Sequence, residues 1–243
     1  MNAFFCVWGR YILFLTLMAA LAGCSVPLPP SQPFSCARLT ETHWMDFDFG
    51  VDSPDDVITA AISLWETERS QVQSMLNVDD EIMNVWWPSD AAVGIGGTYQ
   101  AWFRGGRQLK KIDVRWGHPK PTLAQLIDCL GIPEYYIAFY DQAPEATRFK
   151  LVLLYSETGI VLPYDSPYTS FLRPELPEIH PDVRIDELAV VAPGPPAQMV
   201  TDLYSVGNVG GGYKYSVCLL KPWPGSIEAM EIESAAAFHR CIP

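Results

Sequence analysis

Three carboxylates, Asp46, Asp48 and Asp52, recur at even spacing around Gly50, and oxygen ligands beside a tight turn suit calcium. An EF-hand loop, however, has its glycine at position six and a bidentate glutamate at position twelve, where this chain has Val57. The same carboxylates alternate with apolar residues, as in a half-buried strand. The sequence therefore favours a strand here and predicts no metal site.

Other residues with catalytic potential do not fall into catalytic patterns. No histidine belongs to an HExxH motif, and no Gly-x-Ser-x-Gly elbow occurs. The glycine-rich stretch 207–214 differs from a phosphate-binding loop, because Tyr213 separates its last glycine from Lys214 and no helical pattern follows. We therefore expect no catalytic residues and no cofactor, and a non-enzymatic role is favoured.

Tryptophans are the best indication of an exposed contact. Alternation along a strand places one of Trp86 and Trp87 away from the core, and Trp223 lies between two prolines. Exposed aromatic rings stack on sugars or on the peptide of a partner, while core packing is the ordinary alternative. Trp86, Trp87 and Trp223 are the candidate binding surface.

Composition excludes two classes of protein. The chain of 243 residues has 16 basic and 28 acidic residues, a net charge of −12, so it lacks the basic surface that nucleic-acid binding needs. Aromatic residues make up 12% of the chain, which argues against disorder.

The first 23 residues have the pattern of an export signal. Arg10 is their only charged residue, and the apolar run 11–21 is shorter than the roughly 20 residues that span a bilayer. Leu21-Ala22-Gly23-Cys24 resembles the bacterial lipobox, which implies cleavage before Cys24 and acylation of its thiol. Acyl chains on Cys24 would anchor the protein to a membrane, outside the cytoplasm. Ser25 implies outer-membrane sorting in a two-membrane cell, and otherwise the outer face of the plasma membrane.

Residues 24–35 are rich in proline and predict an extended tether. The export signal also permits disulfides among the four cysteines that follow, which allow three pairings. The positions of Cys218 and Cys241 on either side of a predicted hairpin slightly favour that pair, and a buried free thiol is an alternative for Cys129. The candidate disulfide cysteines are Cys36, Cys129, Cys218 and Cys241.

Helix-type and strand-type patterns alternate along residues 36–243, the predicted globular region, with sub-units 36–118 and 119–243 as a further division. Short turns between strands imply antiparallel pairing. We expect an α+β fold with antiparallel sheet and short helices on one face, built from two or three tandem helix-then-strands units. Helices are predicted at 54–67, from 122 to 130 and after 195, and strands at 81–87, 98–104, 108–116, 135–140, 149–155, 160–162, 185–191, 213–220 and 227–232. The proline-dotted stretch 163–181 is predicted as a surface loop.

The helix that ends in Leu130-Gly131-Ile132-Pro133, followed by aromatic strands, resembles a helix–Leu-Gly-x-Pro–strand unit of small envelope proteins. These are the BamE-like component of the β-barrel assembly machinery and the β-lactamase-inhibitor-protein fold. The resemblance covers residues 122–162 and implies a fold, not a shared activity. The chain also resembles exported bacterial lipoproteins of unassigned activity.

Two functional hypotheses follow from these patterns. The first is a membrane-anchored binding or assembly module of the cell envelope, with an envelope protein or a glycan as partner. The second is a lipid-anchored carbohydrate-binding protein or glycan hydrolase that uses surface tryptophans and carboxylates, the latter placed about 5–10 Å apart across a cleft.

Overall fold

A computed structural model describes residues 36, 47–64, 68–76, 82–88, 97–105, 107–117, 119–143, 146–165, 169–170, 179–205 and 217–234. All of them belong to one unit, Pro33–Pro243. The predicted signal and most of the tether, with Cys24, lie outside the described residues, as does Cys241.

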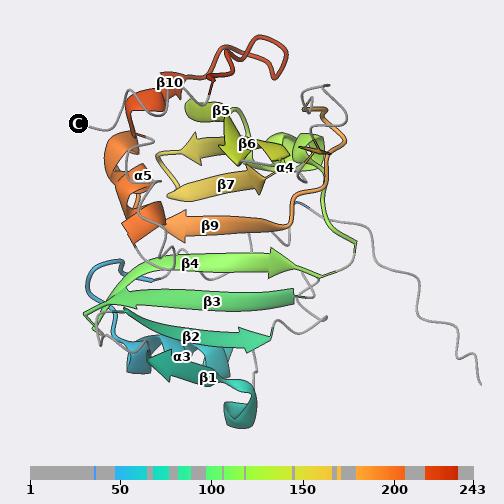
Figure 1. The fold of residues 1–243 in the computed structure, drawn as a ribbon. Coiled ribbons are helices and arrows are strands. Elements are labelled where there is room, and N and C mark those ends of the chain that lie inside the picture. The colour runs from blue at the N-terminus through green and yellow to red at the C-terminus, as the bar shows by residue number, and fades with distance from the viewer. Residues whose placement is uncertain are drawn as a thin grey trace, which may run out of the picture. The chain divides into compact units, whose positions relative to one another are not determined.

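One antiparallel sheet passes through both predicted sub-units and confirms the α+β class (Figure 1). Its strands lie in the order β1-β2-β3-β4-β9-β7-β6-β5-β10, and β8 (Thr169–Ser170) pairs with β6 off this path. The strands of the main path are β1 (Gln73–Leu76), β2 (Ile82–Pro88), β3 (Gly97–Arg104), β4 (Gln108–Trp116), β5 (Tyr135–Ala143), β6 (Ala146–Tyr155), β7 (Ile160–Asp165), β9 (Glu187–Val191) and β10 (Lys221–Pro222).

In the part of the chain that the structure describes, three α-helices of eight or more residues pack on the sheet, and their starts follow from local chemistry. In α3 (Pro54–Leu64), the Ser53 N–H and hydroxyl both donate to the Asp56 carboxylate, at 2.9 and 2.6 Å. In α4 (Leu123–Leu130), Thr122 and Gln125 satisfy each other's backbone N–H groups in a capping box. The third helix is α5 (Pro196–Ser205), with proline at its first position.

The two faces of the sheet are buried in different ways. On one face, side chains from α3 and α4, such as Val57 and Leu126, share a core with alternate residues of β2–β7 and β9. On the opposite face, Met199, Val200 and Leu203 of α5 pack on β5, β6, β7 and β9. The sequence predicts all helices on one face, but α5 lies on the other, because these strands are apolar on both sides.

Two local predictions of strands are wrong. The predicted C-terminal hairpin does not form among the described residues: Val217–Leu219 is a 3₁₀ turn, and β10 pairs with Tyr135 and Tyr136 of β5. Residues 221–222, which the sequence places at the turn of that hairpin, instead add a short strand to the edge of the sheet beside β5. Residues 47–50 form a turn instead of a strand, in which the Asp52 carboxylate accepts the Asp48 N–H at 2.8 Å.

Cys36 and Cys129 form a disulfide, with their Cα atoms 5.1 Å apart. The chain before α3 is thereby linked to α4. Cys129 is therefore not a free thiol. Cys218 is also disulfide-bonded, and Cys241, the partner that the sequence favours, lies outside the described residues.

Among the residues that the structure describes, no helix has the length and apolar character that crossing a bilayer requires.

Candidate functional site

β7 and β9 separate from each other in the middle of the sheet. The two strands pair only through Ile160–Val190 and Val161–Ala189, although β7 continues to Asp165. On its other side, β9 stays paired with β4. The Trp116 N–H at the end of β4 donates to the carbonyl of Asp186, directly before β9, at 3.0 Å. The result is a fork between β7 and β9.

Gly159 and Pro163 explain where this pairing begins and ends. The Val191 N–H donates to the Gly159 carbonyl at 2.9 Å, and a Cβ on Gly159 would lie 2.2 Å from the Val191 carbonyl oxygen. Alternate residues of an antiparallel strand form hydrogen bonds with the same neighbour. The backbone groups of residues 161 and 163 of β7 therefore face β9, as do those of Gly159 directly before the strand. Pro163 has no N–H to donate there, and the ladder stops.

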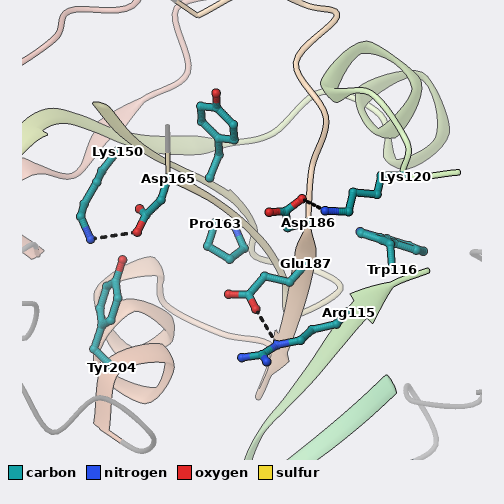
Figure 2. A pocket seen from close by; sticks show the side chains of 10 residues that line it. Arg115, Trp116, Lys120, Lys150, Pro163, Asp165, Asp186, Glu187 and Tyr204 are labelled. Carbon is teal, nitrogen blue, oxygen red and sulfur yellow. Dashed lines mark hydrogen bonds and ion pairs between the residues drawn. The ribbon is translucent and has the colours of Figure 1, made fainter. Parts of the chain in front are cut away.

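A pocket of about 590 Å³ occupies the fork (Figure 2). Its size is in the range that holds a small molecule. One wall comes from β4, β9 and the segments before α4 and β9, and the other from β6 and β7, with one residue of α5. The lining residues are Arg115, Trp116, Lys120, Asp186 and Glu187 on the first wall, and Lys150, Pro163, Tyr164, Asp165 and Tyr204 on the second.

Three ion pairs line this fork pocket. Lys120 Nζ lies 2.6 Å from Asp186 Oδ1, and Arg115 Nε lies 3.3 Å from Glu187 Oε2. On the opposite wall, Lys150 Nζ lies 3.2 Å from Asp165 Oδ2. Figure 2 shows the first two pairs across the pocket from the third, with Pro163 between them. The lining thus carries three positive and three negative groups.

Burial and neighbouring carboxylates raise two pKa values in the pocket. Burial raises the pKa of Glu187, and Asp113 adds to this, although Arg115 and Lys111 act in the opposite direction. Burial also raises the pKa of Tyr164, assisted by Asp186 and Asp165. Glu187 thus holds a proton more readily than an exposed glutamate, and Tyr164 remains a hydrogen-bond donor at neutral pH.

Behind Glu187, a buried charged cluster lies on the same face of β3 and β4. Lys111 Nζ lies 3.0 Å from Asp113 Oδ2, and the Trp102 Nε1–H donates to the same oxygen at 2.7 Å. The Lys111 ammonium also lies 5.3 Å from the centre of the Trp102 ring. Removing Lys111 or Asp113 would leave the other charge buried without its partner, which is costly. These side chains therefore hold one another in place behind the pocket.

The structure separates the three predicted surface tryptophans. Trp87 is fully buried and stacks on Tyr99, with the ring centres 5.5 Å apart. Trp86 points to the opposite face of β2 and is half-buried. Trp223 packs edge-on against Tyr136 at 6.1 Å, outside the fork pocket. The three therefore do not form one patch.

Sequence reasoning did not identify the fork pocket, because its residues come from six separate places along the chain. One residue in the sequence could have indicated the fork, namely Pro163. The sequence analysis assigns it to a loop, whereas the structure places it inside β7. Asp186 and Glu187 also stand at the start of an otherwise apolar strand. The described residues contain no group of three or more His, Cys, Asp or Glu side chains arranged to hold a metal ion.

Comparisons with protein families, with curated proteins and with solved structures find no match to this chain. The resemblance of residues 122–162 to the BamE-like unit remains a prediction. The function must therefore be argued from the chemistry of the chain itself.

Proposed function

We propose that this chain is a lipid-anchored binding module of the bacterial cell envelope, and that the fork pocket holds a small polar ligand. The fork pocket carries this proposal, because it brings donors and acceptors of both charges together in a space of about 590 Å³. The envelope location rests on the lipobox-like sequence that ends at Cys24.

The chemistry of the lining favours binding over catalysis. The cations on both walls already have a carboxylate within 3.3 Å, an arrangement that orients hydrogen-bonding groups rather than activating a nucleophile. The described lining includes no histidine, cysteine or serine. Tyr164 and Tyr204 add apolar ring surface with a polar tip, which suits a ligand with both kinds of surface.

A thermal-shift panel on the full chain in detergent micelles tests the pocket. Compounds would include amino acids, short peptides, mono- and disaccharides and inorganic phosphate. A ligand at about 100 times its Kd stabilises the folded state by about 2.7 kcal/mol. The shift should disappear in Asp186→Asn and persist in Asp182→Asn, an exposed neighbour outside the lining. If no compound distinguishes these two variants, the pocket is not a binding site.

Cys24→Ala tests the anchor separately. We expect the wild-type chain to fractionate with membranes and to carry acyl mass on its new N-terminus, and the variant to lose both properties. A wild-type chain without acyl mass would overturn the anchor and leave the pocket proposal standing.

Glycan hydrolysis is the second candidate, favoured by the carboxylates on both sides of the fork pocket. Glu187, with its raised pKa, would donate the proton, while Asp165 on the opposite wall would act as nucleophile or base. The release of reducing ends from cell-wall glycans should then disappear in Glu187→Gln without loss of glycan binding. If the wild-type chain releases none, this candidate is excluded.

A further inference from the structure

The fork pocket is electrically balanced, and this balance constrains its ligand. Its three cations and three carboxylates are joined in pairs within the lining. A ligand that contacts one of these charges strongly must therefore compete with the partner already present.

A ligand with a single charge would break a pair without replacing it. An anion at Lys150 competes with Asp165, and the Lys150 side chain is only 7% exposed. A cation at Asp186 likewise competes with Lys120. In each case the pocket, whose charges balance when it is empty, would carry an excess of one sign, and the displaced protein group would have no opposite charge to pair with. The chain's net charge of −12 also disfavours the approach of anions.

A ligand with both charges leaves the pocket electrically neutral. Its carboxylate can take the place of Asp165 at one wall while its ammonium takes the place of Lys120 at the other. The displaced Asp165 and Lys120 side chains are 49% and 32% exposed, so water can solvate them when they turn away.

We propose that the fork pocket binds a small zwitterion, with an ammonium and a carboxylate a few bonds apart, as in a free amino acid or a short peptide. The ligand carboxylate binds Lys150, and the ligand ammonium binds Asp186. This inference rests on the proposed function and adds the chemical class of the ligand.

Four probes of similar size and different charge test the charge requirement: glycylglycine, N-acetylglycine, glycylglycinamide and N-acetylglycinamide. They carry both charges, a negative charge, a positive charge and no charge, respectively. In calorimetric titrations of the full chain in micelles, glycylglycine should bind at least about tenfold more tightly than the other three. Glycine and triglycine then distinguish a free amino acid from a peptide as the preferred source.

Two variants test the assigned contacts. Asp186→Asn, at a side chain that is 74% exposed, should weaken glycylglycine binding at least about tenfold, and Asp182→Asn should not change it. Lys150→Met keeps the apolar stem and should weaken binding of N-acetylglycine and glycylglycine alike. If Lys150→Met does not fold, Asp186→Asn still decides the question.

The outcomes separate this inference from the proposed function. Equal binding of N-acetylglycinamide and glycylglycine would overturn the zwitterion and leave a polar pocket. Binding of a disaccharide that Asp186→Asn weakens, without binding of glycylglycine, would do the same in favour of a neutral glycan. If no probe or sugar binds, both proposals are overturned.

Discussion

The two halves of the sheet are built differently. Strands β2–β4 bury one apolar face, where Tyr99 and Phe103 lie, and present polar and aromatic side chains such as Gln100 and Trp102 on the other. Strands β5–β7 and β9 bury both faces, with Leu153 on one side and Leu154 on the other. The first half therefore alternates in sequence, and the second half reads as continuous apolar runs.

The fork pocket lies where these halves meet. β9 pairs with β4 of the first half and with β7 of the second. The β4–β9 pairing runs along the whole of β9, whereas the β7–β9 pairing stops after two residue pairs. Charged residues accumulate at this boundary because an opening between strands lets their side chains reach water. We therefore expect most of the stability to come from the doubly buried half, while the proposed binding site lies at the boundary.

The largest expected effect concerns the link between the halves. Cys36, before the first half, is bonded to Cys129 in α4, 93 residues away in sequence. For a loop of this length, the chain-entropy model predicts that Cys36→Ser/Cys129→Ser lowers the free energy of unfolding by about 4–5 kcal/mol. Urea denaturation measures it, with Ala124→Ser as control. A loss below about 1 kcal/mol would mean that the two parts do not depend on this link.

Next comes the contrast between the faces. Leu154→Ala removes a fully buried side chain and should lower the free energy of unfolding by about 2–5 kcal/mol. Gln100→Ala, on the polar face of β3, should cost less than about 1 kcal/mol. Urea denaturation of both variants tests the two-layer description, which fails if the costs are similar.

A smaller effect is expected at Pro163. Pro163→Val restores an N–H that faces β9, and one added hydrogen bond contributes about 0.5–1.5 kcal/mol. We expect the β7–β9 ladder to lengthen and the fork pocket to narrow, so ligand binding falls while stability is kept or rises. Amide hydrogen exchange at position 163 measures the new bond. Rapid exchange there would show that proline does not hold the fork open.

The smallest effects are pH-dependent and have opposite signs in the two regions. The pKa of Glu187 is raised by burial, so its contribution to stability is lost as pH rises through that pKa. The pKa of Asp56, at the start of α3, is lowered by its hydrogen bonds from Ser53, so its contribution is lost as pH falls.

As pH rises from about 4 to 7, the wild-type chain should therefore lose stability relative to Glu187→Gln, and as pH falls below about 4 it should lose stability relative to Asp56→Asn. Urea midpoints at several pH values give both slopes. Slopes of the same sign would contradict the assignment.

Local patterns were sufficient to predict much of the fold. The alternation in 108–116 and the helical spacing of Leu123, Leu126 and Leu130 act within a few positions, and β4 and α4 lie where these signals place them. Non-local features were not predictable. Which of Trp86 and Trp87 faces the core depends on register with β3, and the face that α5 covers depends on strands distant in sequence.

The candidate site was less predictable than the fold. Arg115 and Glu187 form a pair although 72 positions separate them, and nothing local to either residue indicates the other. Sequence reasoning instead selected Trp223, whose ring packs against Tyr136. Charged residues at strand ends are too common in sequences to indicate which of them converge.

The position of β9 has a consequence for the order of folding. β4 and β7 can each join their hairpin neighbours as soon as they are made, but they remain separate until residues 187–191 arrive between them. Until then both strands have an open edge, which is a template for association with other chains. Such late, long-range pairing slows folding. A chaperone that binds extended segments would be most useful to this protein in that interval.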